Sequence, residues 1–85
     1  MKEYTGNDGR LYREVQLKDG TSAKIKVPTL RELHIIKKKY RNKPGRNSSY
    51  MVQDFVLFND KKRTIEQIDN MGIGDTIRIN QALLQ

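Results

Sequence analysis

The sequence contains no cysteine and a single histidine, His34, among its 85 residues. Without cysteine the chain can form neither disulfide bonds nor thiolate metal sites, which favours a reducing compartment such as the cytosol. Without a second histidine, His34 has no partner for a zinc site or a nucleophilic dyad, and we expect it at the edge of an apolar helix face. The sequence therefore predicts no enzymatic activity, no metal site and no cofactor.

Long apolar segments are also missing. No apolar run approaches the roughly 20 residues of a membrane-spanning helix, and the first ten residues, MKEYTGNDGR, lack the apolar region of a secretion signal. Leu, Ile, Val and Phe nevertheless supply 21 of the 85 residues, which is enough for a folded chain. We expect one small domain with a modest core and no contact with a membrane.

Carboxylates are absent from one part of a chain whose net charge is +7. Residues 34–46 carry no Asp or Glu, whereas the other 72 residues balance 11 bases against 10 acids. The cations of this segment could contact phosphates or an acidic protein partner: Lys37, Lys38, Lys39, Arg41, Lys43 and Arg46. On a helical wheel Lys39 lies apart from the others, and lysines also suit a helix C-terminus, so a solvated helix end is a third interpretation.

Two runs of alternating apolar residues, 11–17 and 22–27, predict a β-hairpin. A three-residue loop that ends at a left-handed Gly20 pairs Val15 with Ala23, and it turns the apolar residues of both strands to one face. A two-residue loop would place them on opposite faces. Residues 2–5 are expected to add a short third strand.

Pro28 ends the second strand of the hairpin, and a helix follows. Thr29 and Glu32 fit the capping box, in which two side chains satisfy free amide groups at a helix start. One face of this helix is expected to pack on the hairpin: Leu30, Leu33, Ile36 and Tyr40. Ile35 points away from that face.

A second helix is expected from Ser48 or Ser49 through Phe58. Apolar residues surround it almost completely, which is typical of a helix that is central or is buried against a partner. A strand is the alternative interpretation for residues 55–58.

A third helix begins at the capping box of Thr64 and Gln67. Gly72 is expected to end it in the left-handed conformation. Residues 76–84 follow as a last helix capped by Asp75, or as a strand, because some of their apolar residues alternate.

No internal repeat divides the chain, so these elements predict a single small α+β domain. In it, an N-terminal β-hairpin, or three strands, packs on three to four helices. The expected parts are the hairpin at 1–28, a helix at 29–42, a basic Pro-Gly loop at 43–48 and a helical part at 49–85.

Two stretches of the chain resemble a known family. Residues 17–20, LKDG, followed by residues 23–33, AKIKVPTLREL, resemble the start of small tail assembly chaperones of long-tailed bacteriophages, in particular the Mu-like tail assembly protein family. The apolar residues Ile65, Ile68 and Met71, followed by Asp75, are similar to the closing helix-turn-helix of that family. The resemblance implies a non-enzymatic phage or prophage chaperone. Such a chaperone binds the tape-measure protein, a long and partly apolar helical rod, in the bacterial cytoplasm and keeps it soluble.

Apolar residues without an evident place in the core predict where a protein partner, or a second copy of the chain, would bind. These residues are Ile35, Tyr50, Met51, Phe55 and Phe58. The strong positive charge is not a feature that the family implies. It supports an alternative function, a small nucleic-acid-binding protein that uses the cations from Lys37 to Arg46.

Overall fold

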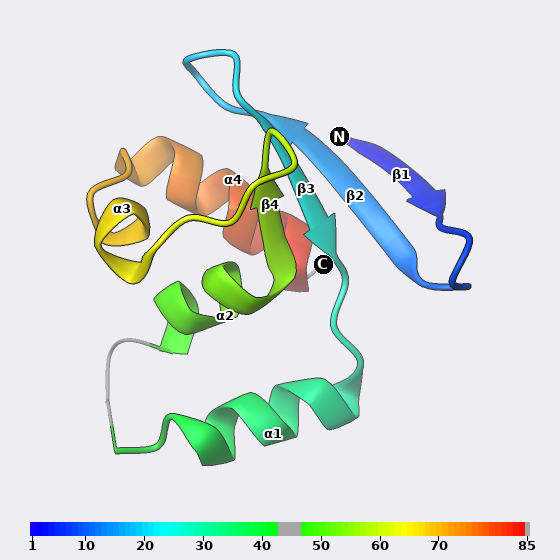
Figure 1. Ribbon diagram of the computed structural model, residues 1–85, viewed down its shortest axis with the longest axis vertical. Coiled ribbons are helices and arrows are strands. Elements are labelled where there is room, and N and C mark those ends of the chain that lie inside the picture. Colours follow the sequence, from blue (N-terminus) through cyan, green and yellow to red (C-terminus); the bar gives the residue numbers. More distant parts are fainter. Residues whose placement is uncertain (43–46, 85) are drawn as a thin grey trace.

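The computed structural model describes residues 1–42 and 47–84, and it has the predicted α+β architecture. The elements follow one another as β1 (Lys2–Thr5), β2 (Leu11–Gln16), β3 (Ser22–Lys26), α1 (Leu30–Lys39), α2 (Asn47–Phe55), β4 (Val56–Phe58), α3 (Ile65–Asp69) and α4 (Ile73–Leu84). The strands form one antiparallel sheet in the order β1-β2-β3-β4. In Figure 1, α4 packs on β2 and β3, α2 lies beside β4, and α1 lies below α2, away from the strands.

The hairpin of β2 and β3 has the predicted register, with Val15 opposite Ala23. The amide of Leu17 donates to the carbonyl of Thr21 at 2.9 Å, which leaves the three predicted residues in the loop. Gly20 has a φ of +90°, the left-handed conformation that glycine adopts most readily. The short strand expected at residues 2–5 is also confirmed, as β1.

The core lies between the sheet and the helices. Its least exposed side chains include Ala23 and Ile25 of β3, Val56 of β4, and Ile79 and Ala82 of α4. Residues paired across neighbouring strands point to the same face of a sheet. Since Ile25 is paired with Val56, the apolar rows of β3 and β4 form one continuous surface on the core side of the sheet.

The expectation of a helix through Phe58, and of a wholly helical part from residue 49 onward, is wrong for residues 56–58, where the alternative of a strand is confirmed. The helix ends at Phe55, and β4 joins the sheet beside β3, with Phe58 opposite Ala23. A tight turn follows, in which Asn59 takes a φ of +49° and exchanges hydrogen bonds with Ser22 on β3 at 2.9 and 3.0 Å. The free edge of β3 explains the strand, because it offers backbone partners that a helix would leave unpaired.

α2 also starts earlier than expected, at Asn47, so Ser48 and Ser49 lie inside the helix. Their hydroxyls instead donate to side chains of other helices: Ser48 to Asn80 Oδ1 of α4 at 3.0 Å, and Ser49 to Asp69 Oδ1 of α3 at 2.7 Å. Residues 47 and 48 of the predicted loop at 43–48 are therefore helical, and its residues 43–46 lie outside the described part of the chain.

The capping box that starts α3 is confirmed, because the side chains of Thr64 and Gln67 bond each other's backbone amides. The predicted glycine ending is wrong: α3 stops at Asp69, and Gly72 does not take a left-handed conformation. Residues 76–84 are helical, as part of an α4 that begins at Ile73. Asp75 consequently lies in its first turn, where the carboxylate accepts a bond from the backbone amide of Lys18 at 3.1 Å.

Candidate functional site

Helix α1 begins where the sequence predicts. The Thr29 hydroxyl accepts a bond from the Glu32 amide at 3.2 Å, and the Glu32 carboxylate accepts one from the Thr29 amide at 2.9 Å. Arg10, just before β2, adds a contact that the sequence did not reveal. Its guanidinium donates to Glu32 Oε1 at 2.5 Å and to the carbonyl of Val27 at 3.0 Å. Polar contacts therefore tie the start of α1 to the hairpin.

The predicted packing of α1 on the hairpin is wrong. Among the described residues, α1 meets the molecule mainly through α2. Ile36 is buried, and the ring of Tyr40 stacks on that of Tyr50, with centroids 4.0 Å apart and ring planes at 8°. Leu30, which was assigned to the packed face, is 70% exposed. The hairpin has no apolar face left for α1, because β4 extends the sheet and α4 covers its inner side.

The exposed side of α1 combines apolar and basic side chains in two neighbouring rows. Leu30, His34 and Lys38 follow one another four residues apart, and Arg31 and Ile35 form the row beside them. Together they line a shallow groove of about 390 Å³, and Ile35 is 55% exposed, as predicted. Glu32, the acidic residue of α1, pairs with Arg10 and does not line the groove, so the charged side chains that line it are Arg31 and Lys38.

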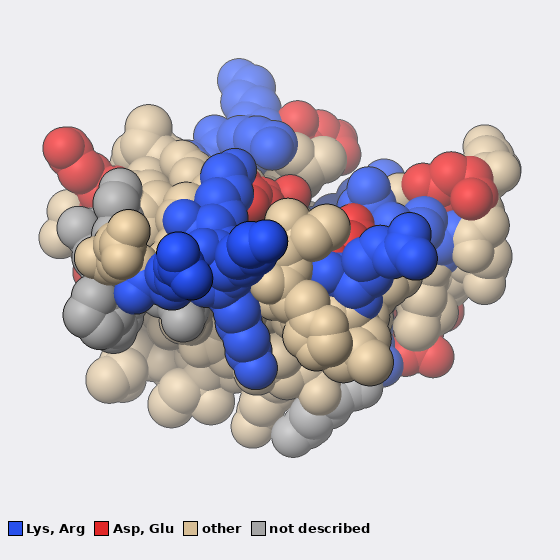
Figure 2. All heavy atoms as spheres, turned by 90° about the horizontal axis from the view of Figure 1, so that it is seen from below, with Lys and Arg blue, Asp and Glu red and all other residues tan. Residues whose placement is uncertain are grey.

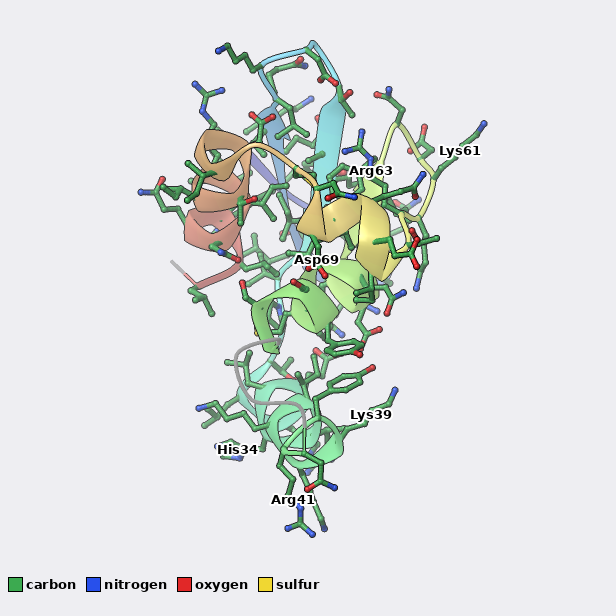
Figure 3. All side chains as sticks on the ribbon, turned by 90° about the vertical axis from the view of Figure 1, so that its left-hand side faces the viewer. His34, Lys39, Arg41, Lys61, Arg63 and Asp69 are labelled. Carbon is green, nitrogen blue, oxygen red and sulfur yellow. The ribbon has the colours of Figure 1, made fainter. Side chains whose placement is uncertain are left out.

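The cations predicted as phosphate or acidic-partner contacts do not gather on one face of α1. Four of them are exposed: Lys37, Lys38, Lys39 and Arg41. The other two, Lys43 and Arg46, lie outside the described residues. Figure 3 shows His34 and Lys39 on opposite sides of α1 and Arg41 at its end. Figure 2, seen from the α1 side, shows blue side chains over the C-terminal end of α1 and a second blue group beyond an intervening tan surface.

Lys39 is directed toward α2 rather than into the groove. Its ammonium lies 5.1 Å from the centroid of the Tyr40 ring. The Tyr40 phenol and, less strongly, the charge of Asp54 on α2 raise the pKa of Lys39 above its usual value. Lys39 therefore stays charged at neutral pH, but it belongs to the side of α1 that is already packed.

Of the residues predicted to bind a protein partner, Ile35 alone keeps a largely exposed side chain. Tyr50 and Met51 are half-buried, whereas Phe55 and Phe58 are 9% and 3% exposed, so their prediction as surface contacts is wrong. The strand β4 is the reason. Alternation along it turns Phe58 into the core, and Phe55 is the last helical residue before it on the same side.

Sequence reasoning missed a second exposed apolar surface, on α4. Ile73, Ile77 and Leu84 are 80%, 51% and 63% exposed. A helical wheel of residues 73–84 would have placed them on one line. The strand alternative for residues 76–84 left this exposed helix face unrecognised.

Residues 1–42 and 47–84 contain neither a candidate metal site nor a candidate membrane-spanning helix. No group of three or more His, Cys, Asp or Glu side chains in that part of the chain could hold a metal ion. None of the helices described there combines the length and apolar character needed to cross a membrane. His34, the one histidine, is exposed on α1.

Comparison with known proteins found no match among protein-family models, curated proteins or solved structures. The resemblance to tail assembly chaperones therefore stays a prediction from the residues.

Proposed function

We propose that the protein is a non-enzymatic assembly chaperone of the phage tail type, and that its helix α1 binds an amphipathic helix of a partner. The observation that carries this proposal is the exposure of Leu30 and Ile35 beside Arg31, His34 and Lys38. A tape-measure protein is the partner that the resemblance implies. A helical rod with apolar and acidic side chains would suit the two rows of α1, since a partner helix can lie in the groove between neighbouring rows.

The apolar and basic residues of α1 contribute differently to the affinity and selectivity of such a complex. Burial of an Ile or Leu side chain contributes about 1.5–3 kcal/mol, so Leu30 and Ile35 supply most of the affinity. The cations select a partner with acidic residues and speed its association, while contributing less to the final affinity.

The proposal is tested with a labelled helical peptide of about 20 residues, long enough to form a helix on binding. The peptide carries a leucine row flanked by glutamates, and in a matched peptide lysines replace the glutamates. Fluorescence anisotropy should show binding of the acidic peptide only. Ile35→Ser should weaken this binding about tenfold or more, because it removes the buried apolar side chain.

Ile77→Ser on α4 is the matched control, since Ile77 and Ile35 are 51% and 55% exposed. It should leave peptide binding unchanged. Equal affinities for the two peptides, or an Ile35→Ser variant that binds as tightly as the parent, would contradict the proposal.

Phosphate binding is the competing function, favoured by the exposed cations at the end of α1. Their spread around the helix argues against it, because a nucleic-acid-binding helix presents its cations to one groove or strand. Titration with duplex and single-stranded DNA between about 50 and 200 mM salt distinguishes the two functions. We expect no binding that falls steeply with salt, and such binding would favour the nucleic-acid function instead.

A further inference from the structure

We infer that the partner helix carries two carboxylates seven residues apart, which reach Arg31 and Lys38 on either side of an apolar residue that contacts Ile35. This inference rests on the proposed function, and it adds which acidic helices the groove selects. Arg31 and Lys38 line the groove and lie seven positions apart along α1. At about 100° and about 1.5 Å per residue, they are within about 20° of one another around the helix axis and about 10.5 Å apart along it. The two cations therefore form one line on α1.

Ile35 lies midway between these cations along the helix axis. It follows Arg31 by four residues and precedes Lys38 by three, so its side chain is a neighbour of both. This side chain is 55% exposed. The outward side of α1 therefore presents a cation, an apolar side chain and a second cation in succession.

Arg31 and Lys38 form no ion pair with a carboxylate in the described part of the chain, and both are exposed. Other cations are engaged within the molecule. Arg10 and Arg13 pair with glutamates of the chain, and Arg78 donates to a backbone carbonyl of β2. Two unpaired cations beside an exposed apolar side chain make this surface complementary to carboxylates that a partner supplies.

Helix geometry determines the pattern that the partner must carry. Two helices that cross at a small angle, about 20°, keep their facing positions aligned over two turns. Carboxylates seven residues apart on the partner also lie about 10.5 Å apart and on one line, so both reach the two cations at once. An apolar residue three or four positions after the first carboxylate then lies opposite Ile35. The groove therefore selects an acid, an apolar residue and a second acid within two turns of helix.

Two labelled helical peptides of identical composition test the spacing. Both carry the same leucine row and two glutamates, which are seven residues apart in the first peptide and five residues apart in the second. A separation of five residues turns the second glutamate about 140° away from the first, so the two cannot face α1 together. Fluorescence anisotropy should show the first peptide binding at least about threefold more tightly, because it makes one more charge pair. Equal affinities would overturn the inference and leave the proposed function intact.

Charge reversal identifies which glutamate meets which cation. Lys38→Glu should weaken binding of the first peptide about tenfold or more, because it sets two like charges against each other. A peptide in which lysine replaces one of the two glutamates should restore the binding, whereas a peptide with the other glutamate replaced should not. Arg31→Glu should show the opposite choice between the two lysine peptides. Losses that both peptides restore equally, or that neither restores, would overturn the inference.

Lys61→Glu is the matched control, because it makes the same change of net charge at an exposed residue just after β4. Figure 3 shows Lys61 at the other end of the molecule from α1. This variant should weaken binding of the first peptide less than about twofold. A loss as large as that in Lys38→Glu would overturn the inference, since net charge alone would then explain the effect.

The inference and the proposed function fail in different ways. An acidic helix that binds α1 whatever the spacing of its glutamates rejects the inference alone. Absence of binding by either acidic peptide rejects the proposed function, and the inference with it.

Discussion

Glu32 is the side chain on which the start of α1 depends most. It closes the capping box with Thr29 and receives the guanidinium of Arg10. Burial raises the pKa of this carboxyl, but the hydrogen bonds from Arg10 and Thr29 lower it by more, so the pKa of Glu32 lies below its usual value. A carboxylate whose pKa is lowered by folding stabilises the folded state only while it is ionised.

Glu32→Gln should lower the free energy of unfolding by about 1 kcal/mol at neutral pH, because glutamine keeps the capping box but loses the ion pair. The contribution of Glu32 is complete above its unfolded pKa of about 4.3, and it is lost as the pH falls through the lower folded pKa. Urea unfolding of both proteins at a series of pH values should therefore show the two stabilities converging in acid. A difference that stays constant with pH would contradict this role.

Arg13 is a charged residue on the inner face of the sheet, paired with Ile25, and its side chain is only 11% exposed. Its guanidinium donates to the carbonyl of Ala82 in the last turn of α4 at 2.8 Å and to Glu3 at 2.8 Å. A cation at this end of a helix satisfies a free carbonyl and complements the helix dipole.

Arg13→Met should cost about 1–2 kcal/mol of stability, because it keeps the apolar stem but leaves the carbonyl of Ala82 without this donor. Glu3→Gln is the control, since the Glu3 side chain is 52% exposed and the exposed pair should contribute little. Thermal unfolding measures both. Equal losses of stability in the two variants would contradict this role. They would mean that Arg13 stabilises the fold through its ion pair with Glu3 and not through the carbonyl of Ala82.

Helix α1 is the element that the rest of the molecule holds least. It packs on α2 through the buried side chain of Ile36 and the stack of Tyr40 on Tyr50. The side that carries the groove is exposed to solvent. Elements with few buried apolar contacts open locally before the whole domain unfolds. A helix held in this way can adjust its position to the partner helix that we propose for it.

Tyr40→Ala should loosen α1 without unfolding the sheet. The expected result is faster hydrogen exchange at the amides of residues 33–40, at least tenfold, with exchange in β2 and β3 little changed. Mass spectrometry of peptic fragments measures this difference. Equal acceleration in the sheet would mean that α1 is part of the cooperative core.

The elements that the sequence predicted well are those with local signals. The hairpin loop and both capping boxes depend on residues only a few positions apart, and all three are confirmed. The sequence indicated a strand at residues 55–58 only as an alternative to a helix, because Val56–Phe58 becomes a strand by pairing with β3, more than 30 residues earlier. The same non-local pairing buried Phe58 and displaced α1 from the hairpin.

The residues of the candidate site were likewise predicted well only where the signal was local. The exposure of Ile35 followed from its place on a helical wheel, and this is confirmed. The exposure of Leu30 could not be foreseen, since it depends on which element covers the hairpin. The prediction that Phe55 and Phe58 form a partner surface is wrong because apolar character alone does not distinguish a binding surface from a core.

At the scale of the whole molecule, two exposed apolar surfaces differ in charge. The groove on α1 combines Leu30 and Ile35 with the cations Arg31 and Lys38, whereas the exposed Ile73 of α4 lies beside an acid, Asp75, as well as beside Lys18 and Arg78. The groove on α1 is therefore the surface of this basic domain, net charge +7, that suits a partner with acidic residues. The central claim is that the partner helix lies on α1.

Amide chemical shifts of the labelled protein, recorded as the acidic helical peptide is added, test that claim most directly. We expect the largest changes at residues 30–39, around Ile35, and little change at the amides of α4 and of β1 to β3. The same titration of Ile35→Ser should give much smaller changes. Changes centred on α4 or on the sheet, or no change in α1 at saturating peptide, would contradict it.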